Sequence, residues 1–242
     1  MTSLDYFFFS AFPYVAIIVF IVGSIYRYRQ KGFQVTSLSA QFLEGKHGFW
    51  GTVPFHFGIL MIFLGHLVAF LFPKAVLAWN SDPVRLIAHE GLGFTFAVAL
   101  LVGLVVLILR RLLHPRLKVV TSRMDLLIEG VLLVQIILGC WIALGYRWGS
   151  SWFAADLSPY LWSIIKLNPQ PEAVVAMPPV IKAHIIGAFS ILLIFPFTRL
   201  VHILFAPFHY LWRPYQVVIW NWDKKRIRKA STAWSDARPR NN

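Results

Sequence analysis

The sequence predicts an all-α integral membrane protein, built as a bundle of five transmembrane helices. Its 242 residues are 58% hydrophobic and only 14% charged, which does not describe the surface of a soluble domain. Several apolar runs reach the roughly 20 residues that a helix needs to cross the hydrocarbon core of a bilayer. We therefore expect residues 1–206 to form the transmembrane bundle and residues 207–242 to form a basic cytoplasmic tail.

The apolar runs place the helices in order along the chain. We expect them at about residues 6–27, 50–72, 86–110, 124–146 and 180–206. No Lys or Arg precedes the first run, so it lacks the basic segment of a cleaved signal peptide and should stay as a membrane helix. The long connection over residues 147–179 holds five prolines around an amphipathic stretch, which favours an outer-surface loop with one or two interfacial helical turns.

The basic residues predict the orientation of the bundle. Of the 23 Lys and Arg residues, 18 fall in the first and third loops and the C-terminal segment, and 5 fall on the opposite side. The positive-inside rule assigns the richer side to the cytoplasm, so we expect the N-terminus outside and the C-terminus inside. Topology thus accounts for the net charge of +13, and we expect contact with anionic lipid rather than nucleic acid.

Four histidines lie within the predicted spans, where ionisable groups are costly and usually functional: His56 and His66 in the second helix, His184 and His202 in the fifth. At 1.5 Å per residue the first two are separated by about 15 Å and the last two by about 27 Å. The two helices are antiparallel, so His56 is predicted to pair with His202 near the inner face and His66 with His184 near the outer face. Tilt, sloping cofactor planes or a bend near Pro196 must absorb the difference.

Two level-matched imidazole pairs favour two haem groups as cofactors. An iron with imidazole on both faces has no open coordination position, so its natural role is electron transfer. The single cysteine, Cys140, excludes a cysteine-ligated iron–sulfur cluster or zinc site made by this chain alone. Gly58, Gly65 and Gly187 could admit a porphyrin or serve helix packing equally well. Buried hydrogen-bonding histidines, or a proton path in a transporter, are the alternative interpretation.

Four segments carry a resemblance to a known family: FFFSAFPYVA, PFHFGILMIFLGH, RRLLHPR and FPFTRLVHILFAPFHYL. With them the chain resembles, over nearly its whole length, the gamma or cytochrome b subunit of membrane-bound respiratory nitrate reductase. The resemblance implies an inner-membrane protein of anaerobic respiration with two b haems, one between His56 and His202 near the cytoplasm and one between His66 and His184. It also implies two partners, a cytoplasmic iron–sulfur subunit and a molybdopterin catalytic subunit.

The same resemblance implies quinol oxidation near the outer haem. Arg85 stands there at a position more usually lysine, with His89 one turn later and Glu90 beside it. We expect Arg85 to position a quinone oxygen or a haem propionate, and His89 or Glu90 to receive a proton; anchoring at the membrane interface is the plainer role. Near the inner face the candidate propionate partners are Arg110, Arg111 and Arg199, although positive-inside flanking explains them equally well.

The sequence leaves two other functions open. A similar cytochrome could serve another cytoplasmic iron–sulfur oxidoreductase, such as a sulfite- or heterodisulfide-reductase-like complex. A haem-free transporter or a membrane anchor for a peripheral complex would also explain the spans. Nitrate reduction itself is expected on a partner chain, because this one has no motif for molybdenum or iron–sulfur binding.

Overall fold

The structure, a computed structural model, describes residues 2–31 and 48–204, and these residues form helices and connections without a strand. Five helices are long and apolar enough to cross a membrane: Ser3–Gln30, Phe49–Leu71, Pro83–Leu113, Arg123–Gly145 and Pro179–Phe197. The predicted class, an all-α multi-pass membrane protein with five spans, is confirmed. The loop 32–47 and the predicted tail 207–242 lie outside the described residues.

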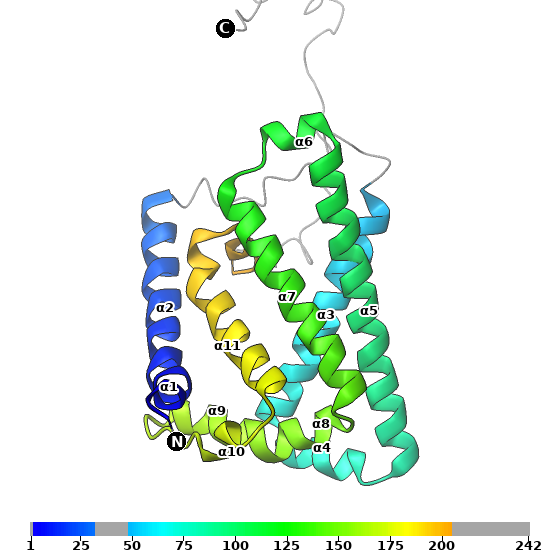
Figure 1. Ribbon diagram of the computed structural model, residues 1–242, viewed down its shortest axis with the longest axis vertical. Helices are drawn as coiled ribbons and strands as arrows, with labels where there is room; N and C mark the ends of the chain where they lie inside the picture. Colours follow the sequence, from blue (N-terminus) through cyan, green and yellow to red (C-terminus); the bar gives the residue numbers. More distant parts are fainter. Residues whose placement is uncertain (1, 32–47, 205–242) are drawn as a thin grey trace, which may run out of the picture. The chain divides into compact units, whose positions relative to one another are not determined.

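Figure 1 shows the arrangement of these elements. The first span consists of α1 (Ser3–Tyr6), the π-helical η1 (Phe7–Ala11) and α2 (Phe12–Lys31). The other four spans contain α3 (Phe49–Leu71), α5 (Pro83–Leu113), α7 (Arg123–Gly145) and α11 (Pro179–Ile194). Short elements connect them: α4 (Pro73–Asn80), α6 (Pro115–Val119), α8 (Gly149–Trp152), the π-helical η4 (Phe153–Leu157), α9 (Ser158–Ile165) and α10 (Glu172–Val175).

The long helices pack in the order α3, α5, α7, α11, α2, each against the next. Glycines make the first of these contacts close. A Cβ on Gly103 of α5 would lie 2.5 Å from the backbone nitrogen of Phe55, and one on Gly58 of α3 would lie 2.7 Å from the Leu100 Cβ. Gly58 thus serves contact between helices, as small residues do in membrane bundles, rather than the approach of a porphyrin.

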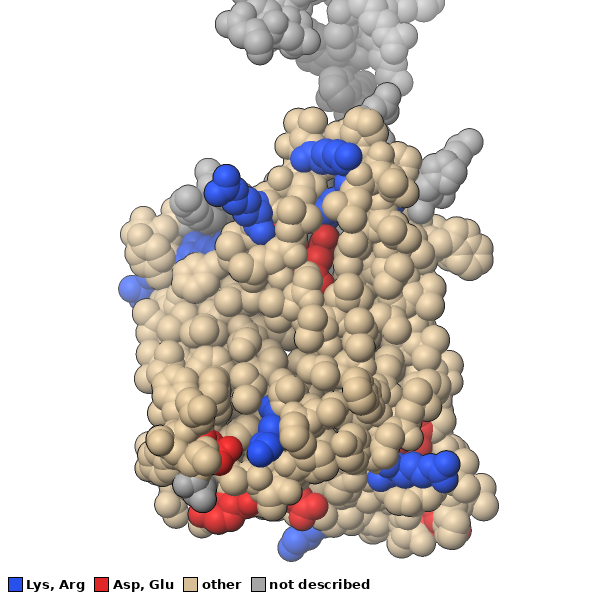
Figure 2. Space-filling view, viewed as in Figure 1, with Lys and Arg blue, Asp and Glu red and all other residues tan. Residues whose placement is uncertain are grey.

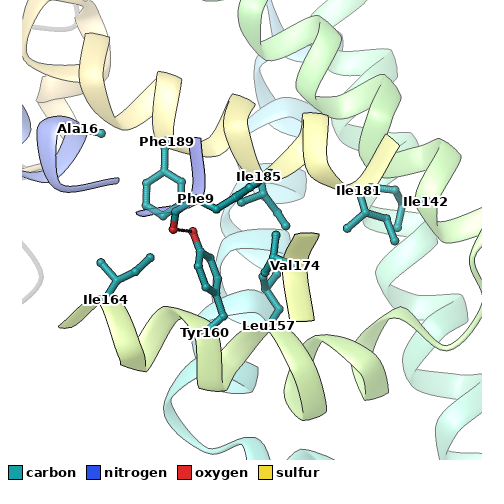
Figure 3. Close-up of a cluster of buried hydrophobic side chains, with 10 residues drawn as sticks. All are labelled: Phe9, Ala16, Ile142, Leu157, Tyr160, Ile164, Val174, Ile181, Ile185 and Phe189. Carbon is teal, nitrogen blue, oxygen red and sulfur yellow. Dashed lines mark hydrogen bonds between the residues drawn. The ribbon is translucent and has the colours of Figure 1, made fainter. Parts of the chain in front are cut away.

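One end of the bundle is covered by the long connection between α7 and α11, and this end is called the α9 end below (Figure 1). The Tyr160 hydroxyl of α9 donates to the Phe9 carbonyl oxygen over 2.9 Å (Figure 3), and the Trp162 indole donates to the Phe70 carbonyl oxygen over 3.0 Å. The connection therefore packs across the ends of the first span and α3, with more helix than the one or two turns predicted.

The opposite end carries α6 and is called the α6 end (Figure 1). On the face shown in Figure 2, charged side chains gather toward the two ends, and the band between them holds none on its surface. This distribution matches a hydrocarbon-spanning belt with polar ends.

The α-helix of the fifth span is shorter than the predicted range of about residues 180–206. The α-helix α11 ends at Ile194, and the chain continues as two 3-10 segments, η5 (Phe195–Phe197) and η6 (Arg199–Ile203). Pro196 causes the break, because it has no N–H and its ring clashes with the preceding helical turn. Thr198 is extended (φ −108°, ψ 176°) and caps η6 by accepting from the Leu200 amide.

Candidate functional site

Two of the four candidate histidines lie toward the α9 end. His66 is exposed on α3, five residues before that helix ends, and its ring meets the Phe153 ring edge-on with 5.2 Å between centroids. His184 is half-buried near the start of α11. The structure thus places both members of the predicted outer pair toward the α9 end.

The other two histidines lie toward the α6 end. His56 is exposed in the first half of α3, and His202 is half-buried on η6. Because η6 is not a continuation of α11, the helical spacing of about 27 Å expected between His184 and His202 does not apply. Instead, the chain passes from α11 to His202 through η5, the extended Thr198 and η6.

Hydrogen bonds fix the tautomer of three of these imidazoles. The Nδ1–H of His56 donates to the Thr52 carbonyl oxygen over 2.8 Å, and that of His66 donates to the Ile62 carbonyl oxygen over 2.8 Å. His202 Nδ1 donates in the same way to the carbonyl oxygen of Arg199. A carbonyl oxygen only accepts, so the proton is on Nδ1 and each Nε2 keeps its lone pair for a metal.

These features fit a haem held by two histidines. His56 and His66 are exposed inside a span, where an imidazole facing hydrocarbon alone would be costly. Among residues 2–31 and 48–204 no group of three or more His, Cys, Asp or Glu side chains gathers around one point. Axial ligation of a haem iron requires two side chains, not three, and the donor set suits it.

The turn that carries His202 is held from the first span. The Arg27 Nη1 of α2 donates to the carbonyl oxygens of Pro196 and Thr198 over 2.6 and 2.8 Å. A Cβ on Gly23 would lie 2.9 Å from the Pro196 Cβ, so the glycine makes room for the proline ring. Arg27 thus partners carbonyls freed by the helix break, as a buried turn requires.

A network of ions holds the same end from α7. Asp125, whose side chain is 4% exposed, pairs with Arg199 Nε over 2.6 Å and lies 3.5 Å from Arg111 Nη1. Arg111 Nε also pairs with Glu129 over 2.8 Å. Two of the three predicted propionate partners therefore face carboxylates of this chain, whereas Arg110 lies beside Arg111 in the last turn of α5.

Sequence reasoning missed Asp125 and Glu129. The available signal was two carboxylates one helical turn apart within the first two turns of an apolar span, where unpaired acids are rare. Arg199, which pairs with Asp125, is 74 positions further along the chain, so no local sequence pattern indicates this ion pair.

The predicted quinol-site residues fall into two groups at the α9 end. Arg85 is 45% exposed, lies over the Trp79 ring at 5.1 Å, and has its Nε 4.0 Å from Asp82. This placement suits a cation at the membrane interface that a headgroup or ligand can reach.

His89 and Glu90 instead join α5 to α4 and α8. The His89 Nδ1 lies 3.1 Å from the Asn80 Oδ1, and the Asn80 amide donates to Ser150 Oγ over 2.9 Å. Glu90 accepts from the Ser150 amide over 2.8 Å and from its hydroxyl. Neither of these hydrogen-bond networks includes Arg85, whose ion pair is with Asp82.

Comparison with known proteins gives one family. The model of the nitrate reductase gamma subunit family matches residues 5–221. The nitrate reductase gamma chain of Bacillus subtilis is 32% identical over 209 residues, which cover 85% of this chain and 93% of that one. In Escherichia coli the gamma chain of respiratory nitrate reductase 2 is 34% identical, covering 89% and 96%, and that of respiratory nitrate reductase 1 is 32% identical, covering 90% and 98%.

Proposed function

The chain belongs to the nitrate reductase gamma subunit family, and from this premise we propose that it is the quinol-oxidising cytochrome b subunit of a respiratory nitrate reductase. In this role it takes electrons from quinol near the outer face and delivers them to a cytoplasmic iron–sulfur subunit. A molybdopterin subunit then reduces nitrate. The family membership supports the complex, and the four histidines support the route of the electrons.

The observation that supports the proposal is that two of the four span histidines lie toward each end of one bundle. His66 and His184 lie toward the α9 end, and His56 and His202 lie toward the α6 end. Two b haems, bound between these pairs, would supply one-electron carriers at two depths. The chain would contribute both axial ligands of each, with Nδ1 held by a carbonyl in three of the four.

The direction of transfer follows from the predicted orientation. If the α9 end faces outside, quinol gives its electrons near His66 and His184, and its protons leave on that side. Nitrate reduction consumes protons in the cytoplasm, so the two half-reactions generate membrane potential without a proton channel through this chain. The α6 end would then face the iron–sulfur partner.

For the quinol itself we propose that Arg85 is the group that binds an oxygen of the ring or a haem propionate. Its guanidinium is exposed and paired only loosely with Asp82. His89 and Glu90 bind Asn80 and Ser150 through Nδ1 and Oε1, so a proton from the quinol would go to His89 Nε2 or Glu90 Oε2. If Arg85→Ala leaves quinol oxidation and inhibitor binding unchanged, this assignment is wrong.

Anaerobic purification with the partner subunits tests the function. Addition of quinol should reduce the b-type bands, and subsequent nitrate should reoxidise them. Quinol reduction without reoxidation by nitrate would keep the cytochrome and remove the nitrate assignment, in favour of another iron–sulfur oxidoreductase. The absence of any b-type spectrum in the assembled complex would favour a haem-free anchor.

A further inference from the structure

His184 differs from the other three candidate ligands in how its ring is held. In the other three, Nδ1 donates to a carbonyl three or four residues earlier on the same segment. In His184, Nδ1 is buried and has no hydrogen-bond partner. A buried donor without a partner is destabilising, so an unpartnered Nδ1 on a candidate iron ligand needs an explanation.

The groups around His184 come from α7. A Cβ on Gly139 would lie 3.2 Å from the His184 Cε1, so the imidazole packs directly over this glycine. One turn earlier on the same helix, Gln135 donates its Nε2 to the His184 carbonyl oxygen over 3.0 Å. Gln135 therefore already binds the backbone of the ligand whose ring packs beside it.

The other atom of the Gln135 amide is also unpartnered. Its Oε1 is buried without a hydrogen bond, as is the His184 Nδ1, so one acceptor and one potential donor remain unused at the same helix crossing. Gly187 of α11 leaves room for this amide, because a Cβ on that residue would lie 2.2 Å from the Gln135 Oε1. The glutamine is thus fitted into α11 one turn after His184.

We propose that Gln135 is the positioning residue of His184, with its Oε1 accepting the His184 Nδ1–H while its Nε2 keeps the carbonyl. The inference rests on the proposed function, in which His184 is an axial ligand of the outer haem. The bond requires a rotation of the imidazole over Gly139, and it would satisfy both unpartnered atoms. The bond fixes the Nδ1–H tautomer, directs Nε2 toward the iron, and makes the ligand a stronger donor.

A stronger donor stabilises ferric iron, so loss of the bond should raise the midpoint potential of the outer haem alone. In Gln135→Leu we expect the ferric-to-ferrous ratio of that haem at a fixed potential to fall about tenfold, which for one electron is about 59 mV. The low-spin ferric EPR signal of the same haem should also shift, because the ring is free to turn. Gln135→Glu loses the donor to the His184 carbonyl oxygen but keeps an acceptor for Nδ1–H, so it should not raise the potential.

Gly187→Ala provides a second test that leaves the polar groups in place. Its methyl group displaces the end of the flexible glutamine side chain, which can move without disturbing backbone, so the variant should fold even if Gln135→Leu does not. We expect a shift in the same direction, and no additional shift when the two substitutions are combined. Gly130→Ala on α7, with no heavy atom within 4 Å of the new Cβ, is the matched control.

Redox titration and EPR of the intact complex separate the outcomes. Wild-type protein without b haem would refute the proposed function itself. Two haems with unchanged potentials in Gln135→Leu and Gly187→Ala, or an equal shift of both haems, would refute the role of Gln135 and leave the function standing.

Discussion

Replacing Gly103 with alanine tests whether the contact between α3 and α5 sets the position of the histidines on α3. The added Cβ would lie 2.5 Å from the Phe55 backbone nitrogen and 2.9 Å from the Gly51 carbonyl oxygen. Backbone atoms cannot rotate away, so the helices must separate there by about 1 Å to restore ordinary contact, at a cost of about 1–3 kcal/mol. Phe55 directly precedes His56, which moves with the displaced backbone.

The assay combines thermal unfolding in detergent micelles with the reduced-minus-oxidised spectrum of each haem. Gly103→Ala should unfold at lower temperature and show an altered or depleted inner haem, with the outer haem retained. Gly93→Ala on the same helix is the control, since its Cβ would meet nothing within 4 Å. If both variants match the wild type in unfolding temperature and spectrum, the close glycine contact does not position α3.

Three further substitutions test the ends of the bundle. Arg27→Met leaves two carbonyl oxygens of the η5–η6 turn without their donor, each at about 1–3 kcal/mol, and should speed hydrogen exchange at residues 199–203 but not in the centre of α5. Asp125→Asn removes the negative charge that faces Arg199. Because 22% of the Arg199 side chain is exposed, the free energy of unfolding should fall by less than the about 3–5 kcal/mol expected for a fully buried ion pair. An unchanged unfolding midpoint would contradict that pairing. Tyr160→Phe removes the donor to the Phe9 carbonyl and should cost about 1 kcal/mol in thermal unfolding, with both haem spectra unaltered.

The spans were predictable because a bilayer imposes a simple rule. Every backbone group must be paired within the segment, so long apolar runs become helices, and the first four fall close to their predicted bounds. The fifth span contains a break whose structure the length of the apolar run does not predict. Pro196 signals a bend in the sequence, but the 3-10 turn persists because Arg27, 169 positions from Pro196, satisfies its carbonyl oxygens.

The candidate site also has a part that the sequence predicts and a part that only the packing of the helices shows. The sequence places four histidines inside predicted spans, and the directions of the helices predict which of them lie at the same depth in the membrane. The sequence does not show which arginines form ion pairs with carboxylates of the same chain. From the sequence, Arg111 and Arg199 are candidate partners for propionates. In the structure the packing of α5, α7 and η6 pairs Arg111 with Glu129 and Arg199 with Asp125.

The same limit applies to the groups that orient the ligands. Gly58 follows His56 by two residues and Gly187 follows His184 by three, and both lie in apolar runs. In the structure Gly58 receives Leu100 of α5 and Gly187 receives Gln135 of α7. The helix that packs against each glycine distinguishes helix contact at Gly58 from accommodation of a glutamine at Gly187. No local sequence pattern identifies that helix.

We propose that His66 and His184 hold one haem and that His56 and His202 hold another. The most direct test of this assignment is the redox titration of the b-type bands in membranes that carry His66→Ala or His56→Ala, compared with the wild type. We predict two haems in the wild type, loss of the quinol-proximal haem alone in His66→Ala, and loss of the other haem alone in His56→Ala. Loss of both haems in folded protein of either variant, or of neither, would contradict the assignment.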